Sequence, residues 1–188
     1  MGELKDYSGP FNHHIKYEDF SKDALIKLLI EYSRTHIITM GGWHDFIRWK
    51  YNDREAIDLD ITQWLATAPL VTRFISRALD IQGNDVETWF KRLQMDPGLS
   101  LGIFDIEWDL KNPDHGIFTV NRCNTLEYLE REGKGYEVFL CQEEEPRNFA
   151  DAARSFNSDM KVTALKLPPR KSNDQIACQW EFKLETVI

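Results

Sequence analysis

The hydrophobic positions in the first part of the chain recur with the spacing of amphipathic helices. One largely apolar stripe runs from Leu25 to Ile47, and Ser21 stands before it as a candidate N-cap. Gly41 and Gly42 interrupt this stripe, so we expect the helix to bend or break there.

A second helical pattern begins after Asn52, and its apolar face starts at Ile57. Pro69 lies inside this pattern and removes one backbone hydrogen bond, which predicts a kink. Gly83 is the expected stop, and a shorter helix is predicted after Asn84. The first part of the chain is therefore predicted to be helical throughout.

The period changes to strict alternation in the second part of the chain, which is typical of strands with one wet face. Phe104–Leu110 forms the first predicted strand, Asn112–Gly116 the turn, and Ile117–Arg122 the returning strand. A second pair of strands is predicted at Lys161–Leu167 and Gln175–Glu185.

Two helices are predicted between these pairs of strands. The first begins at Asn124 and ends near Gly133, and the second begins around Pro146, a residue that suits the first helical position. The acidic run Glu143–Glu145 precedes this start, where the positive end of a helix favours carboxylates. We therefore interpret the run as a solvated helix start and not as a metal site.

The predicted order of elements is helices followed by β-β-α-α-β-β. This order predicts an α+β fold, with N-terminal helices packed on a four-stranded antiparallel sheet. We expect residues 1–18 to form a mobile leader and residues 19–188 a single domain. That domain divides into a helical part, residues 19–96, and a sheet-containing part, residues 99–188.

Composition and charge exclude several classes of protein. A hydrophobic content of 42% is typical of a globular chain, and the net charge of −8 comes without a basic stripe, so we expect no nucleic-acid partner. No apolar run approaches the ~18 residues of a membrane span, and the start has no apolar signal region. Three cysteines make a poor disulfide framework, so we expect a cytoplasmic protein with free or metal-bound thiols.

No standard catalytic motif is present, so the candidate chemistry rests on single residues. Cys123 precedes the predicted helix start at Asn124, where the helix dipole favours a thiolate. Cys123 is therefore a candidate nucleophile with His44 as its general base, although an inert, partly buried cysteine is an equal alternative. His36 lies on the apolar stripe and is more typical of a core histidine.

Carboxylates and thiolates are the other groups of the chain that could carry chemistry. Asp58 and Asp60 cannot face each other on one helix, which argues against a paired-carboxylate site. Thiolates are the other candidate ligands, and a zinc site would use Cys123, Cys141 and Cys178. Their spacing matches no common zinc motif, and Cys178 is better interpreted as a small buried hydrophobe in a strand.

Aromatic residues make up 12% of the chain, and packing accounts for most of them. Bent helices seldom close perfectly on a sheet, so a pocket for a small, partly apolar molecule is also predicted. Its expected lining comprises His36, Trp43, Trp64, Trp108 and Trp180.

Several segments resemble a known group of proteins: ITQWL after Asp60, NRCNTLEYLEREGKG, FLCQ, KLPPRKSND and CQWEFKLE. They are similar to an uncharacterised group of small prokaryotic cytosolic proteins that resembles L-2-amino-thiazoline-4-carboxylate hydrolase. The order of elements is also similar to that of the 4-vinyl reductase domain and the vesicle-tethering TRAPP subunits. The resemblance singles out the three cysteines, but Ala164–Leu167 stands where such relatives carry C-x-x-C.

These observations together predict a small-molecule-binding cytoplasmic protein. The resemblance implies hydrolysis of a C–N or C–S bond, for which Cys123 and His44 are the candidates. The alternative is a non-catalytic ligand-binding or interaction module with structural cysteines. A homodimer is expected only by analogy with the tethering subunits.

Overall fold

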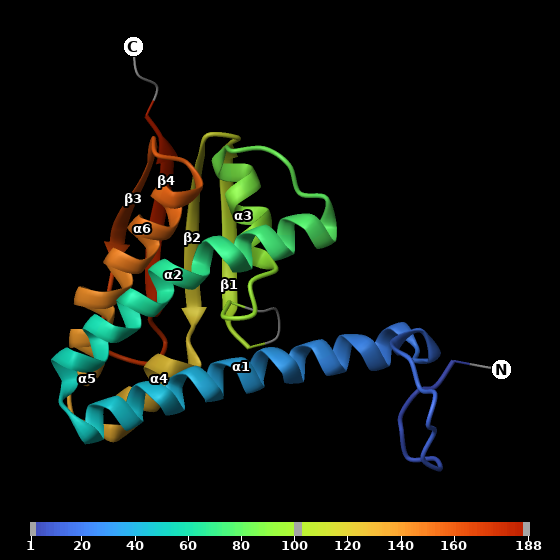
Figure 1. Cartoon of the computed structure of the whole chain (residues 1–188). Coiled ribbons are helices and arrows are strands. Elements are labelled where there is room, and N and C mark those ends of the chain that lie inside the picture. Colours follow the sequence, from blue (N-terminus) through green and yellow to red (C-terminus); the bar gives the residue numbers. More distant parts are fainter. Residues whose placement is uncertain (1–2, 100–102, 186–188) are drawn as a thin grey trace.

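The computed structural model describes residues 3–99 and 103–185 and confirms the α+β architecture (Figure 1). Residues 1–2 of the expected leader, and residues 100–102 and 186–188 of the expected sheet-containing part, lie outside the described residues. The elements are η1 (Tyr17–Asp19), α1 (Lys22–Lys50), α2 (Asp53–Leu79), α3 (Val86–Gln94), β1 (Asp105–Asn112), β2 (His115–Arg122), α4 (Asn124–Glu132), α5 (Tyr136–Phe139), the π-helical turn η2 (Leu140–Glu144), α6 (Glu145–Phe156), β3 (Met160–Lys166) and β4 (Cys178–Leu184).

The sheet has the strand order β1-β2-β4-β3, and every neighbouring pair is antiparallel. The predicted four-stranded antiparallel sheet is thus confirmed. Phe118 of β2 pairs with Trp108 on one side and with Trp180 of β4 on the other. These inward residues alternate with polar ones, because successive side chains of a strand point to opposite faces.

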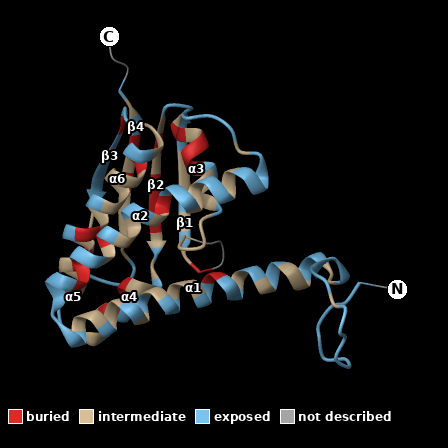
Figure 2. Ribbon diagram, in the orientation of Figure 1, coloured by how far each residue is buried: buried red, intermediate tan, exposed pale blue. Residues whose placement is uncertain are grey.

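Helices cover one face of this sheet (Figure 1), where α3 and α6 supply the layer that touches it. α2 packs across α6. It runs back antiparallel to α1, whose N-terminal end projects beyond the sheet. Burial follows this arrangement, because buried residues concentrate in α3, β2 and β4, whereas α1 is mostly exposed or half-buried (Figure 2). The main core lies between α3, α6 and the sheet, and its largest members are Trp89, Phe90, Phe118, Trp180 and Phe182.

Local capping signals predicted several helix ends correctly. The Ser21 side chain accepts a hydrogen bond from the Ala24 N–H, and Asn52 Oδ1 accepts one from the Glu55 N–H at 2.9 Å. Gly133 ends α4 with a φ of 66°, in the left-handed region that glycine tolerates.

The glycine pair does not break the first helix, so that part of the expectation is wrong. α1 runs without interruption from Lys22 to Lys50. Glycine lowers helix propensity by only about 1 kcal/mol per residue relative to alanine and keeps its N–H. α2 contains Pro69 in its interior, as the sequence predicts, and it ends at Leu79, before the predicted stop at Gly83.

The helix predicted to start at Pro146 in fact belongs to a longer helical run. That run begins at Tyr136 and passes through η2 into α6, where Pro146 lies in the first turn. A proline is tolerated there because the π-helical turn already breaks the α-helical hydrogen-bond ladder. The prediction that the acidic run is a solvated helix start is therefore wrong for Glu144, which is only 2% exposed. Within this run it holds only for Glu143, which is exposed.

The N-terminal segment contacts the start of α1. The N–H of Leu4 donates to the carbonyl oxygen of Asp19, and the N–H of Ser21 donates to that of Leu4, each at 2.8 Å. Within the described part of the chain, no helix has the length and apolar character needed to cross a membrane.

Gly116 provides a test of the packing between α3 and the sheet. A Cβ atom at Gly116 would lie 2.5 Å from Cε2 of Phe90, so we expect Gly116→Ala to lower the free energy of unfolding by about 1–3 kcal/mol. Gly42→Ala in α1 is the control, because its Cβ would meet nothing within 4 Å. We expect that variant to be up to about 1 kcal/mol more stable. Urea denaturation measures both, and equal stability of Gly116→Ala and wild type would contradict this packing.

Candidate functional site

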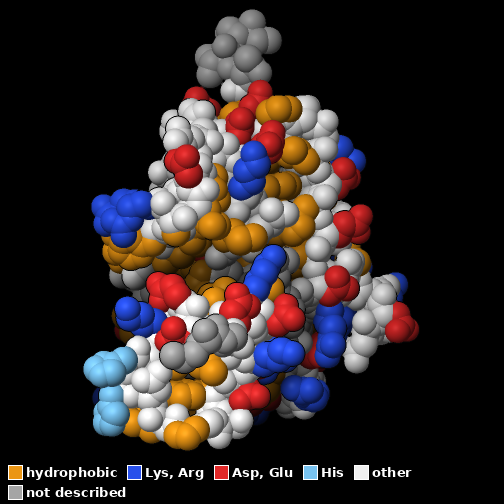
Figure 3. Space-filling model, turned by 90° about the vertical axis from the view of Figure 1, so that its right-hand side faces the viewer, with side chains coloured by type: hydrophobic (Ala, Val, Ile, Leu, Met, Phe, Trp, Pro, Cys, Tyr) orange, Lys and Arg blue, Asp and Glu red, His pale blue; other side chains and the backbone are white. Residues whose placement is uncertain are grey.

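A cavity of about 310 Å³ lies between α1 and α2 and the helix-covered face of the sheet. Hydrophobic side chains from nine elements form most of its wall, among them Ile37, Trp64, Leu93, Val120, Leu126 and Phe149. One face of the molecule is hollowed across its middle, above the N-terminal part, and hydrophobic side chains gather there (Figure 3). A concave and mostly apolar enclosure of this size is the usual form of a small-molecule site.

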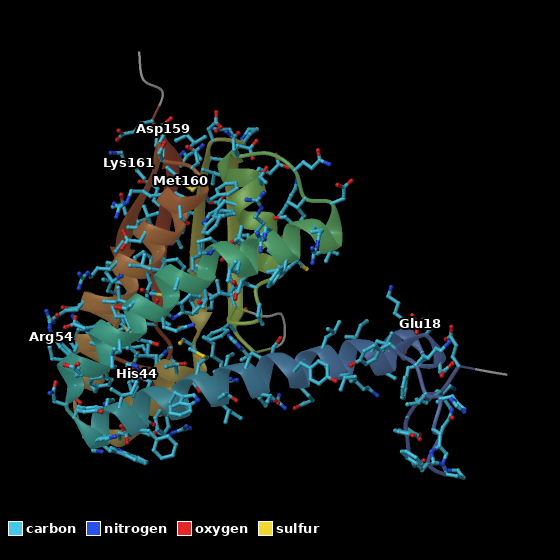
Figure 4. The ribbon with its side chains drawn as sticks, in the orientation of Figure 1. Glu18, His44, Arg54, Asp159, Met160 and Lys161 are labelled. Atoms are coloured by element: carbon cyan, nitrogen blue, oxygen red, sulfur yellow. The ribbon has the colours of Figure 1, made fainter. Side chains whose placement is uncertain are left out.

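One wall of the cavity is polar. His44 of α1, Asp60 of α2 and Glu144 of η2 each offer a ligand atom, and these atoms lie within 4.8 Å of one another. The three side chains are distant in the sequence. They meet because α1 and α2 form a hairpin that packs against the run from Tyr136 to Phe156. Figure 4 shows His44 inside this hairpin and Arg54 at its outer edge, where Arg54 pairs with the exposed Glu143.

His44 has an oxygen atom beside each of its ring nitrogens. Nε2 hydrogen-bonds the hydroxyl of Tyr136 at 2.6 Å, and Nδ1 lies 3.4 Å from Oδ2 of Asp60. The guanidinium of Arg48 stacks over the Tyr136 ring at 3.5 Å and fixes that ring in place. Burial raises the pKa of Tyr136 well above its usual value, so its hydroxyl keeps its proton at neutral pH.

The carboxyl groups of Asp60 and Glu144 titrate in opposite directions. Burial and the adjacent carboxyl of Asp60 raise the pKa of Glu144. Burial also disfavours ionised Asp60, but the adjacent side chains of His44 and Glu144 lower its pKa on balance. Two adjacent carboxyls seldom ionise together away from water, so without another cation Glu144 holds the proton and Asp60 carries the charge.

The π-helical turn determines where Glu144 points. Tyr136, Leu140, Glu144 and Asn148 follow at four-residue intervals and share one face of the helical run, and the first three are buried. The amide of Asn148 donates to Oε1 of Glu144 at 3.4 Å. This periodicity across Pro146 is the sequence signal that would have placed Glu144 in the site, and treating Pro146 as a helix start concealed it.

All three cysteines line the cavity, but none is an activated thiolate. Burial raises the pKa of Cys123 to about 11 and that of Cys178 to about 12, and it raises the pKa of Cys141 further. Cys123 is itself the N-cap of α4, and its Sγ accepts a hydrogen bond from the Leu126 N–H at 3.4 Å. The expected lowering of its pKa by the helix dipole is therefore wrong, because desolvation outweighs it.

The structure does not pair Cys123 with His44. Both side chains line the cavity, but the ring nitrogens of His44 face Tyr136 and Asp60, and no hydrogen bond joins the thiol to the imidazole within the described residues. The thiols also do not assemble as the predicted metal set. Among the described residues, only His44, Asp60 and Glu144 bring three candidate ligand atoms within 4.8 Å.

The tryptophans expected to line one pocket occupy different places. Trp64 and Trp180 line the cavity, as does His36. Trp43 is 64% exposed on α1, and Trp108 stacks on Phe118 at a ring distance of 5.0 Å without reaching the cavity.

Arg92 of α3 is a cavity residue that the sequence did not single out. Its guanidinium lies 4.1 Å from the centre of the Phe156 ring, and its Nε is buried without a hydrogen-bond partner. No carboxylate forms an ion pair with Arg92 in the described part of the chain, and burial lowers its pKa. An anionic group in the cavity would complete the bonding of this guanidinium.

The fold and the site together define an α+β protein whose helices enclose a mostly apolar cavity with one polar wall. Residues 18–184 match the model of a family of unknown function, DUF6125, and the chain belongs to that family. No curated protein and no solved structure matches the chain.

The thiols provide a test of the electrostatics of the cavity. A pKa of about 11 instead of 9.0 leaves Cys123 with about a hundredfold less thiolate at neutral pH, and burial limits access to its sulfur. We therefore expect iodoacetamide to alkylate Cys123 at least about a hundredfold more slowly than a free thiol peptide. Unfolding in urea should abolish the difference, as followed by peptide mass spectrometry. Alkylation of the folded chain at the peptide rate would contradict the burial of this thiol.

Proposed function

We propose that this protein binds a small, largely apolar molecule in the cavity beneath α1 and α2. The observation that carries the proposal is a concave apolar enclosure that ends at the polar wall formed by His44, Asp60 and Glu144. We further propose the cytoplasm as its location, because its three cysteines are free thiols.

The ligand we propose carries an anionic group. Arg92 has a buried Nε without a partner and forms no ion pair with a described carboxylate, so an incoming anion would meet an unneutralised charge. The apolar body of the ligand would then lie against Trp64, Leu93 and Phe149. This arrangement requires no catalysis and agrees with a ligand-binding module.

Hydrolysis of a C–N or C–S bond is the second candidate function. It is favoured by the position of Cys123 on the cavity wall and by the resemblance described above. For Cys123 to act as nucleophile, a bound substrate would have to bring a base within reach of the thiol, because His44 already contacts Tyr136 and Asp60.

Two alanines of α2 provide a matched test of ligand binding. Ala68 lines the cavity and is 8% exposed, whereas Ala66 faces solvent. Anilinonaphthalene sulfonate is a suitable fluorescent probe because it joins an apolar body to one negative group. We expect Ala68→Phe to weaken probe binding about tenfold or more by filling the cavity, and Ala66→Phe to leave it unchanged.

Circular dichroism establishes that both variants remain folded before titration. Equal affinity of wild type and a folded Ala68→Phe variant would contradict binding in this cavity.

We also propose that the protein forms a homodimer through α1. Trp43, Phe46 and Trp49 are 64%, 59% and 73% exposed, and their rings contact in succession at 6.4 Å and 5.5 Å. A contiguous aromatic row on a projecting helix is unusual for a surface that only faces water. The same row on a second copy would cover it, since a two-fold interface pairs like surfaces.

The exposed row on α1 also has a matched control. We expect wild type to have twice the mass of one chain by light scattering, and Phe46→Glu to have the mass of a single chain, because the charge cannot be buried unpaired. Phe11→Glu changes a phenylalanine of the N-terminal segment that is 75% exposed and should remain dimeric. A monomeric wild type at all concentrations would overturn the proposal.

A further inference from the structure

The polar wall has the donor set and spacing of a metal centre. We propose that His44 Nδ1, Asp60 and Glu144 bind one divalent first-row transition-metal ion at the edge of the cavity. The three ligand atoms lie within 4.8 Å of one another. The 3.4 Å between His44 Nδ1 and Asp60 Oδ2 is close to the ~3.3 Å that separates two ligands of a tetrahedral ion with bonds of ~2.0 Å.

The tautomer of His44 is set by a partner on the other side of its ring. The Tyr136 hydroxyl oxygen lies 2.6 Å from Nε2 and can accept a hydrogen bond from its N–H, which leaves the Nδ1 lone pair directed towards Asp60 and Glu144. Metal-binding histidines usually donate their second N–H to such an oxygen, which orients the ring. Arg48, stacked at 3.5 Å on Tyr136, supports this outer contact.

Glu144 gives an independent indication of a missing cation. The residue is 2% exposed, and its Oε2 has no hydrogen-bond donor within the described residues. No described lysine or arginine forms an ion pair with Asp60 or Glu144, whose only basic neighbour is His44. A divalent ion would balance both carboxylates and bond the free oxygen.

The donor set indicates the class of ion. One imidazole nitrogen with two carboxylates suits Zn²⁺, Co²⁺, Mn²⁺ or Fe²⁺ better than Mg²⁺ or Ca²⁺, which prefer oxygen ligands alone. Because all three residues line the cavity, further coordination positions of the ion would face its interior. The site does not depend on the proposed ligand, since protein atoms alone hold the ion.

Titration of the chelator-stripped full chain with Zn²⁺ and Co²⁺ tests the site. We expect one ion per chain and much weaker binding of Mg²⁺. Asp60→Asn and Glu144→Gln should each abolish binding. Their matched controls are Asp58→Asn and Glu143→Gln, which change exposed carboxylates on the same two elements and should bind as wild type does. Absence of one-to-one binding to the wild type would overturn the proposal.

Two further measurements keep the test decisive. Asp60→Asn or Glu144→Gln could fail to fold, and Tyr136→Phe then provides the test. This variant removes only the outer partner of His44, so we expect it to bind Co²⁺ about 10–100-fold more weakly than the wild type does. Unchanged affinity in this variant would overturn the role of His44 Nδ1. Thiolate-to-cobalt charge-transfer absorption would instead assign the ion to the cysteines and overturn the site.

Discussion

Two carboxyl groups that meet away from bulk water determine what the rest of the site must supply. Asp60 reaches Glu144 where α2 crosses the run from Tyr136 to Phe156, and burial opposes ionisation of both. Such a pair needs a positive charge, either as a proton or as a cation. The imidazole of His44 lies beside it, and the hydroxyl of Tyr136 holds that imidazole from the other side. The polar wall is therefore one connected network.

The same crossing explains the form of the cavity. α2 packs on α6 across the helix-covered face of the sheet, and α1 packs on α2 beyond the ends of the strands (Figure 1). The space that these elements leave between them is the cavity. The aromatic core formed with α3 and α6 lies deeper, against β2 and β4. Apolar packing between α3, α6 and the sheet thus supplies stability. The polar network lies between the α1–α2 hairpin and this core, where the cavity can accept a ligand.

Sequence patterns predicted the local features of this fold and missed the features that depend on tertiary contacts. Alternation in the strands and the caps at Ser21 and Gly133 are short-range signals, and the structure confirms them. The meeting of His44 with Tyr136 joins residues 92 positions apart, and no periodicity reports such a contact. Glu144 was missed because local rules at Pro146 favoured a helix start, whereas the π-helical turn continues the helix and turns Glu144 inwards.

Burial also decides which groups of the cavity can carry chemistry. At Cys123 the helix start and the Leu126 N–H favour the thiolate, yet the thiol stays protonated because these contacts do not offset its desolvation. Asp60 is also desolvated, but hydrogen bonds from its neighbours lower its pKa. Its polar neighbours thus outweigh the burial of Asp60, whereas those of Cys123 do not outweigh the burial of the thiol. The charged groups of this cavity therefore include Asp60 at the polar wall and Arg92, whereas the thiols contribute mainly apolar, polarisable surface.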